Sequence, residues 1–533
     1  MRIQADRFKN MRRGTYEAEG GVAVTGRIME YLVAMVAVIL CIVVPLYAKD
    51  GYYQIGNAKF AAYKTVMTGG SILLIVAVMP YLFFRCKEHR KVCLSVTDRF
   101  VLAYALLTGI SVISGGFYED VVWGSFGWNM GLMSQASFVL LYFFLSRFGR
   151  YGRVIITVLC GVAGIVYGIG ILHRMMFDPI GFYEGLENYQ KAQFLSTLGQ
   201  ATWYGSFLAV TLPVGIGVFI HCEQRVWKIL SAIYMTLGFC TLVTQNSDSA
   251  YFALAGALVL LFVTSAEAQP CMCRFMGVLT LFFGAGKIMY FLMQIHPNPD
   301  LEVDFITNIM WTSKVTWILL FACFATTIAL YVAETGGRKS KGSLKKVKGA
   351  VTVPIFSIGA VAGIVLVIFL QAQGALPEAI SKRLDTISYF NWNDDWGNGR
   401  GRIWRFSAKV FSEENVSHKL FGVGPDGFYS YVSAYHGEEE ELLWGEKMLT
   451  NAHNEWLNIL INGGILGAAA YLGIYVTAIR GCLRDVKRDI LLAGIAAAVV
   501  SYMCYNFFCY QQVLCTPFIF ILVGLGEYIL RRT

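Results

Sequence analysis

Charge is scarce in this chain. Of its 533 residues only 15% are Asp, Glu, Lys or Arg, whereas a soluble globular domain carries about 25%. An ordinary soluble domain is therefore excluded. In its place, apolar runs of about 20 residues recur from end to end, and each is long enough to cross the roughly 30 Å hydrocarbon core of a bilayer. Such runs predict an all-α polytopic integral membrane protein, because the strands of an outer-membrane β-barrel are shorter, roughly 10 residues, and alternate in polarity.

Common metal and nucleotide motifs are also missing. The chain has no H-E-x-x-H, no P-loop and no D-x-D pair, which argues against a zinc protease, a P-loop nucleotide site and a metal-dependent sugar-nucleotide site. The 13 cysteines are scattered, and the close pair Cys271 and Cys273 lacks the second half of a zinc site. We therefore expect no metal site and no cofactor.

The apolar runs predict about 12–14 membrane spans. They are expected at residues 28–47, 64–84, 99–115, 129–146, 154–172, 201–220, 228–245, 250–265, 275–295, 313–332, 351–371, 456–479, 490–508 and 513–530. A basic tail, residues 1–27, precedes the first run, and no small-residue cleavage site follows that run. This pattern favours a cytoplasmic tail over a cleaved signal peptide.

The charge of the connecting loops predicts the orientation. If the tail lies in the cytoplasm, every second span ends there too. The loops at those points are short and basic: 85–91, 146–153, 221–228, 336–348 and 480–489. The opposite loops 117–131 and 297–305 contain no Lys or Arg. The pattern follows the positive-inside rule and places both termini in the cytoplasm. The net charge of +9 then reflects membrane orientation and indicates no nucleic-acid partner.

One outside loop, residues 372–455, is far longer than an ordinary connection. It divides the chain into a bundle of about 11 spans over residues 28–371 and about three spans over residues 456–533. Long loops with varied sequence are usually functional. We therefore expect the site of activity in this loop.

The stretch "GNGRGRIWRFSAKVF", residues 397–411, predicts a short amphipathic helix. Its apolar face consists of Ile403, Phe406 and Val410. Its basic face consists of Arg402, Arg405 and Lys409, with Arg400 just before the first turn. Such a helix suits the outer membrane interface, and its arginines suit the oxygens of a lipid-linked diphosphate. A plain interfacial helix that anchors on lipid is the alternative, and the residues alone leave both open.

Two further stretches carry polar candidates. In "FGVGPDGFYSY", residues 421–431, glycine and proline force a turn, where Asp426 either binds a sugar hydroxyl or caps the next helix. In "NAHNEWLNILINGGILG", residues 451–467, Thr450 or Asn451 is the expected N-cap.

That N-cap would put His453, followed by Asn454, in the first turn of a span. The helix dipole there disfavours the imidazolium ion, so a neutral His453 is a candidate general base; a purely structural histidine is the alternative. The glycines at 463, 464 and 467 are expected to serve close helix packing. Arg174, at the outer end of the fifth span, and Lys191, in the loop that follows, could add positive charge.

In these motifs the chain resembles the O-antigen ligase and O-antigen polymerase family of bacterial envelope glycosyltransferases. The family pattern is a Gly-Arg followed by Ile-Trp, a Gly-x-Gly-Pro turn, and a His-Asn before a glycine-rich membrane helix. The chain has "GRGRIW" (399–404), "GVGPDGF" (422–428) and "AHNEWLNILINGGILG" (452–467) in that order. The segment "FLSTLGQATWYGSFLAVTLP" (194–213) is also similar to the family's.

The resemblance implies a metal-independent membrane glycosyltransferase in the bacterial cytoplasmic membrane. Its donor would be a glycan on undecaprenyl diphosphate, and its acceptor a hydroxyl on a second glycan or a lipid. Arg400 would bind the diphosphate and His453 would activate the acceptor hydroxyl. Arg402, Arg405, Asn454, Asp426, Lys191 and Arg174 are the further substrate-binding candidates.

Two features depart from the family pattern. Where many members have Ser-Arg, the chain reads "TQNSDSAY" (244–251), and Lys191 is the nearest cation before the "STLG" segment. A second phosphate-binding arginine is therefore open. Two other classes remain alternatives: a flippase or other transporter of lipid-linked glycan, which should place charge inside its spans, as Lys287 does, and a scaffold that binds wall polymer.

Overall fold

The computed structural model describes residues 21–89, 93–124, 128–266, 268–297, 301–335, 359, 363–385 and 387–532. These residues are mostly helical, and their single sheet pairs β1 (Phe194–Leu195) with β2 (Gly199–Gln200). Among the described residues, nine helical segments are long and apolar enough to cross a membrane. The chain is an all-α polytopic membrane protein, as its composition predicts.

Thirteen helices of the described residues form the body of the molecule. They are α2 (Gly21–Leu46), α3 (Ile55–Lys87), α4 (Val96–Gly115), α6 (Leu132–Phe148), α7 (Gly152–Arg174), α9 (Ala201–His221), α10 (Arg225–Leu242), α11 (Asp248–Ser265), α12 (Gln269–Ile295), α14 (Lys314–Thr335), α20 (Glu455–Arg484), α21 (Leu491–Tyr505) and α22 (Thr516–Arg531). Each coincides with one predicted span. The remaining predicted span, 351–371, lies mostly outside the described residues, where only Gly363–Ala372 is seen as a helix.

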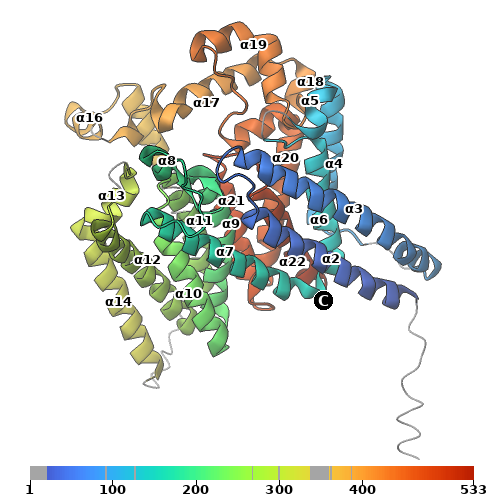
Figure 1. The fold of residues 1–533 in the computed structure, drawn as a ribbon, viewed down its shortest axis with the longest axis horizontal. Helices are drawn as coiled ribbons and strands as arrows, with labels where there is room; N and C mark the ends of the chain where they lie inside the picture. Colours follow the sequence, from blue (N-terminus) through green and yellow to red (C-terminus); the bar gives the residue numbers. More distant parts are fainter. Residues whose placement is uncertain are drawn as a thin grey trace, which may run out of the picture.

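The helices outside this body gather at one end of the molecule. They are α5 (Tyr118–Trp123), α8 (Asn188–Gln193), α13 (Phe305–Thr312), α16 (Glu378–Leu384), α17 (Trp396–Glu413), α18 (Val416–Phe421) and α19 (Phe428–Trp444). Two 3-10 turns, η1 (Gly149–Tyr151) and η2 (Ser388–Phe390), complete the helical elements of the described residues. Figure 1 shows α16 to α19 at the top and the C-terminus at the opposite end. The long loop and the C-terminal end therefore lie at opposite ends of the bundle, as the alternation of loop charge requires.

The centre of the bundle is built on α9 and α21. Both helices are buried along almost their whole length, and a Cβ atom on Gly217 would lie only 2.4 Å from the Cα atom of Gly494. Small residues at this crossing let the two backbones approach closely, which is how helices associate where no water drives them together. Because α21 is surrounded by protein, its 15 residues suffice for its place in the bundle.

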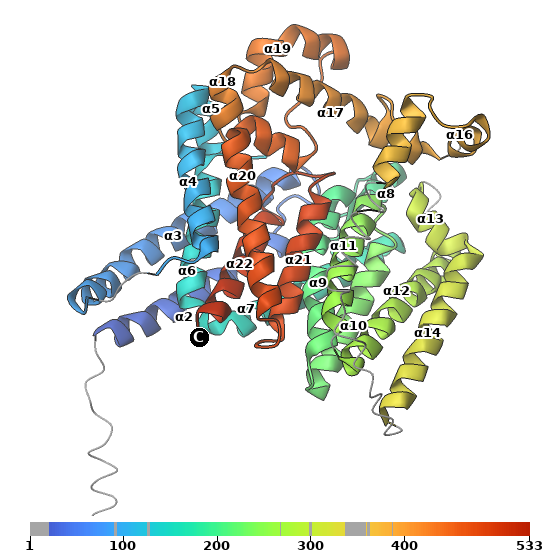
Figure 2. The same cartoon turned by 180° about the vertical axis from the view of Figure 1, so that it is seen from behind.

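A break in α20 attaches the long loop to the bundle. Gly464 has a φ of 67°, so the helix kinks there and the carbonyls of Ile461 and Asn462 are freed. They accept hydrogen bonds from the N–H groups of Val423, at 3.1 Å, and Gly424, at 2.9 Å. Figure 2 shows α18 lying against the upper part of α20. The Gly-x-Gly-Pro turn is thus fixed to a membrane helix by its backbone.

The amphipathic helix predicted over 397–411 is present as α17, but its apolar face is not on lipid. Phe406 and Val410 are buried in a second apolar core, whose other members are Val423, Phe428, Tyr431, Val432, Leu449 and Ala452 of the loop and Ile461 of α20. The ring of Phe406 meets that of Trp444 at 5.2 Å, edge to face. The interfacial interpretation of this face is therefore wrong: the loop folds on its own core, with α17 and α19 packed together.

Candidate active site

Arg400 is held by an unusual turn at the start of α17. Gly397, Asn398 and Gly399 all have positive φ, between 60° and 84°. This left-handed run costs glycine little and is tolerated by asparagine. It brings the Gly397 carbonyl back to accept a 2.7 Å hydrogen bond from Nη1 of Arg400, while Nη2 donates to the carbonyl of Phe508 at 3.1 Å. The guanidinium thus bridges the loop and the segment between α21 and α22.

Aromatic rings enclose this turn. Trp392, Trp396 and Trp404 contact one another with centroids 5.0 to 6.0 Å apart, and Phe508 lies 6.1 Å from Trp404. The indole N–H of Trp396 donates to the carbonyl of Tyr389 at 2.9 Å. The rings place an apolar surface beside the half-buried Arg400, where a charge acts more strongly than in bulk water.

His453 lies in a tight turn before α20. Its φ is 47°, and its N–H donates to Oδ1 of Asn451 at 2.8 Å. The N-cap is Asn454, whose Oδ1 accepts from the N–H groups of Trp456 and Leu457. The prediction of Thr450 or Asn451 as N-cap is therefore wrong, and His453 precedes the helix instead of lying in its first turn.

Arg400 and His453, which come from different parts of the loop, lie close enough for the charge of Arg400 to act on the imidazole of His453. Burial, and then the positive charge of Arg400, lower the pKa of His453 to about 4. The imidazole is therefore neutral near pH 7, as predicted. The cause differs from the prediction, because desolvation and a neighbouring guanidinium, and not a helix dipole, disfavour the charged form.

The segment between α21 and α22 completes the surroundings of this pair. Tyr510 packs edge to face on His453 with ring centroids 5.5 Å apart, and on Trp128 at 4.3 Å. The indole N–H of Trp128 donates to Oγ1 of Thr450 at 2.7 Å. Sequence reasoning assigned nothing to the "NFFCYQQ" stretch, residues 506–512. The feature that could have marked this stretch as functional is its uncharged polar residues, which lie between two apolar runs.

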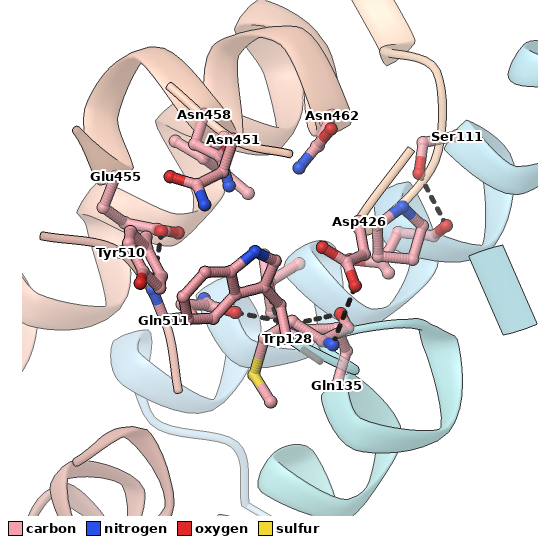
Figure 3. A pocket seen from close by; sticks show the side chains of 16 residues that line it. Ser111, Trp128, Gln135, Asp426, Asn451, Glu455, Asn458, Asn462, Tyr510 and Gln511 are labelled. Atoms are coloured by element: carbon pink, nitrogen blue, oxygen red, sulfur yellow. Dashed lines mark hydrogen bonds between the residues drawn. The ribbon is translucent and has the colours of Figure 1, made fainter. Parts of the chain in front are cut away.

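A pocket opens beside His453 and Tyr510. It contains about 460 Å³ of space between atoms, part of it open to solvent. Ten of its residues are labelled in Figure 3: Ser111, Trp128, Gln135, Asp426, Asn451, Glu455, Asn458, Asn462, Tyr510 and Gln511. They come from α4, α6, α20 and the connecting loops, so the pocket lies where the long loop meets the bundle.

An acidic residue, Asp248, lies in the segment where the family resemblance predicts Ser-Arg, and a second, Asp304, contacts it from the start of α13. Asp248 accepts hydrogen bonds from the N–H of Ile306 and from the hydroxyl of Tyr389. Asp304 accepts one from the N–H of Asp248 at 3.2 Å. Burial and the neighbouring Asp248 raise the pKa of Asp304 to about 6, against the opposite effect of Arg174 and Arg400. The carboxylates of Asp248 and Asp304 thus connect α11, α13 and the long loop at the place where the expected arginine is missing.

The other loop arginines lie apart from this pair. Arg402 donates to the carbonyl of Leu443 at 3.2 Å and lies 3.8 Å from a carboxylate oxygen of Asp394. Arg405 forms an ion pair with the same Asp394 and is half exposed. The basic face of α17 is therefore neutralised by acidic residues of the loop itself.

Arg174 and Lys191 differ in their surroundings. Arg174 is 1% exposed, and its guanidinium donates to the carbonyls of Thr244, Ala192 and Gln245 at 2.5 to 3.3 Å. It ties the end of α7 to the α10–α11 turn and to α8. Lys191 is partly exposed on α8.

The side chains of Asp426 and Asn454 both accept hydrogen bonds from backbone N–H groups. Asp426, with a φ of 61°, accepts a 3.1 Å hydrogen bond from the N–H of Met130 and lines the pocket. The next helix, α19, has Gly427 as its N-cap and no side-chain cap, so the helix-capping interpretation of Asp426 is wrong. Asn454 caps α20.

Within the described part of the chain, no cluster of three or more His, Cys, Asp or Glu side chains could hold a metal ion. The comparisons address the class of protein. Residues 304–472 match the family model Wzy_C, O-antigen ligase. The match contains Arg400, Asp426 and His453 and confirms the resemblance to the O-antigen ligase and polymerase family. None of the curated proteins compared matches the chain.

The molecule is thus a multi-pass membrane protein with a domain, residues 304–472, that matches the O-antigen ligase model. This domain supports a glycan ligase or polymerase type of function in polysaccharide biosynthesis. The family implies a lipid-linked glycan donor and a glycan acceptor in the membrane.

Proposed function

We propose that the protein transfers or polymerises a glycan from an undecaprenyl-diphosphate carrier onto an acceptor hydroxyl at the outer face of the bacterial cytoplasmic membrane, without a metal ion. Both termini would be cytoplasmic and the long loop outside. One observation carries the proposal. Within the segment that matches the O-antigen ligase model, Arg400 and His453 lie close enough for the charge of one to depress the pKa of the other.

Arg400 has the chemistry for the diphosphate. A guanidinium presents planar donors that match phosphate oxygens, and its charge offsets the charge that develops on the leaving group. The neighbouring indole rings and Phe508 are apolar, so the effective dielectric constant around the charge is lower than in bulk water. The diphosphate is already a good leaving group, which is why a metal ion is not required in this proposal.

His453 has the chemistry for the acceptor. The acceptor oxygen attacks the anomeric carbon, the bond from that carbon to the diphosphate breaks, and the diphosphate leaves with the bonding electron pair. The hydroxyl proton passes to a ring nitrogen of His453. A diphosphate bound at Arg400 would offset the guanidinium charge and raise the pKa of His453, so the base becomes stronger once the donor is bound.

The test uses the full chain in proteoliposomes with a defined undecaprenyl-diphosphate oligosaccharide, an acceptor glycan and EDTA. Release of the diphosphate lipid should persist in EDTA. It should fall about 100-fold or more in Arg400→Ala and in His453→Ala. Matched controls are the exposed residues Arg153 and His296, whose alanine variants should release at the wild-type rate. Product length then separates a polymerase from a ligase.

Two outcomes would reject the proposal. Loss of activity in EDTA that is restored by a divalent cation would reject the metal-free mechanism. Labelled lipid that crosses the bilayer without any diphosphate release would reject the transferase in favour of a transporter. Lys287, the clearest charge inside a predicted span, is bound by backbone carbonyls. Its ammonium group donates to the carbonyls of Trp311 and Ser313 at 2.8 and 3.2 Å and so joins α12 to α13.

A further inference from the structure

The pocket beside Tyr510 differs in charge from the surroundings of Arg400. Sixteen described residues line it, and they include two carboxylic acids, Asp426 and Glu455, and no lysine, arginine or histidine. The carboxylate of Asp426, with no lining cation beside it, repels a diphosphate. The pocket is therefore unsuited to the charged part of a lipid-linked donor.

Carboxamides dominate the rest of its polar lining. They are Gln135, Asn451, Asn458, Asn462 and Gln511. A carboxamide presents both a donor and an acceptor, the combination that matches the hydroxyl groups of a sugar ring. In Figure 3 the side chains of Asn451, Asn462 and Asp426 point toward the space around the indole of Trp128.

Two of these carboxamides have unused hydrogen-bonding atoms. Asn462 and Gln511 are each 5% exposed, yet Oδ1 of Asn462 and Nε2 of Gln511 have no partner among the described residues. The other end of Gln511 is fixed, because its Oε1 accepts from Nε2 of Gln135 at 2.6 Å. A buried polar atom without a partner costs roughly 1–3 kcal/mol, so one acceptor and one donor at the same pocket indicate a polar ligand.

The aromatic residues supply the apolar part of such a site. Trp128 and Tyr510 both line the pocket, and the hydrogen bond to Thr450 fixes the edge of the indole ring. An indole face is a rigid apolar surface on which the C–H face of a sugar ring can pack. Tyr510 also contacts His453, so a ring bound here lies next to the candidate base.

We propose that this pocket is a subsite for a sugar ring without negative charge, neutral or amino-substituted, and that it excludes uronic and phosphorylated sugars. The inference rests on the proposed transferase function and specifies the sugar chemistry of that site. The ring belongs either to the acceptor end or to the first residue of the donor. Its hydroxyls bond to Asn462 and Gln511, and the carboxylate of Asp426 accepts a further hydrogen bond or faces an amino group.

The first test measures KM for donor and acceptor separately in Asn462→Ala, Gln511→Ala and the matched control Asn308→Ala, an exposed carboxamide on α13. Each pocket variant should raise KM for one of the two substrates about tenfold, the effect of losing one good hydrogen bond. The control should leave both values unchanged. The substrate that responds identifies the source of the ring. Wild-type KM values in both pocket variants would overturn the inference.

The second test concerns charge. Trisaccharide acceptors, or donors of the same length if the donor KM responded, end in N-acetylglucosamine, galactose or glucuronic acid. The glucuronic acid form should have a KM at least about tenfold higher. Asp426→Asn should narrow that gap, because it removes a charge but keeps an oxygen for the N–H of Met130. Equal KM values for charged and neutral forms in the wild type would overturn the inference.

A third measurement separates this inference from the proposed function. If no glycan transfer occurs with any donor, binding of the free trisaccharides is followed by the fluorescence that Trp128→Phe removes. Saturable quenching by the neutral trisaccharide that is lost in Asn462→Ala would support the pocket even though the transferase proposal had failed. Absence of quenching in the wild type would overturn the pocket as well.

Discussion

At the scale of single residues, the central relation is between the charge of Arg400 and the proton affinity of His453. The pKa of His453 is about 4 in the free protein, lowered by burial and by Arg400. The histidine acts as a base only while neutral. Activity therefore falls as the pH drops through this pKa, and the pKa itself rises when a diphosphate neutralises Arg400.

This relation predicts two different acid limits. The profile of kcat/KM for the donor reports the free protein and should fall to half near pH 4, whereas the profile of kcat reports the complex and should fall at a higher pH. Diphosphate release measured from pH 3.5 to 8 provides both curves. Coincident acid limits would show that the donor does not change the environment of His453.

Glu414, between α17 and α18, gives a prediction about stability. It is 3% exposed, neither carboxylate oxygen has a partner among the described residues, and burial raises its pKa to about 8, against the opposite effect of Lys419. In the unfolded chain its pKa is near 4.3. The stabilisation is complete below the unfolded pKa and is lost as pH rises through the folded pKa, because the unfolded state releases its proton first.

Glu414→Gln should therefore raise the free energy of unfolding by about 1–3 kcal/mol at pH 8, with a gain that shrinks toward pH 4.5. Thermal unfolding in detergent across this pH range measures the effect. The neighbouring, exposed Glu413 provides the matched control, and Glu413→Gln should show no such pH dependence. A stability gain that is equal at pH 4.5 and pH 8 would contradict the assignment.

At the scale of elements, the kink of α20 against α18 holds the long loop in place. Gly464 has a positive φ, and a Cβ atom there would lie 2.4 Å from the backbone of Leu420. Gly464→Ala should therefore destabilise the protein by at least about 2 kcal/mol and lower diphosphate release, because α18 carries the chain into the Asp426 turn.

Gly467 is the control for this substitution. It lies on the same helix, and a Cβ atom added there would have no neighbour within 4 Å, so Gly467→Ala should be neutral or slightly stabilising. Thermal unfolding and activity of the two variants decide the matter. Equal behaviour would mean that the kink does not hold the loop. The expectation that these glycines serve close packing is met by Gly464, which packs on a loop helix and not on a membrane helix.

Sequence reasoning succeeded for elements whose signal is local. The spans follow from apolar run length, and α17 from the spacing of its apolar residues. It failed where a distant partner decides. The apolar face of α17 could equally cover lipid or protein, and only its contact with Phe428 and Val432 settles which. The true N-cap, Asn454, competes with neighbours that are equally good caps. The pocket needs residues from α4, α6, α20 and the 506–512 stretch together.

At the scale of the whole molecule, the distribution of basic loops agrees with the position of the long loop in the fold. The basic loops that the structure describes in full, 146–153, 221–228 and 480–489, lie toward the end that carries the C-terminus, while α17 to α19 lie at the other (Figure 1). Basic residues are retained on the cytoplasmic side during insertion. In the proposed topology the site would face outward, where a glycan assembled on a lipid carrier would meet its acceptor.

Native cysteines allow this orientation to be tested. Of the 13 cysteines only Cys86 and Cys93 are exposed, and both lie next to the basic loop after α3. A membrane-impermeant maleimide should therefore label the protein in inverted vesicles and leave it unlabelled in right-side-out vesicles. In the Cys86→Ser/Cys93→Ser background, Glu446→Cys, at an exposed position after α19, should show the reverse. Labelling of the native pair and of Glu446→Cys from the same side would mean that the loop and the basic ends share a compartment, and the proposed topology would be lost.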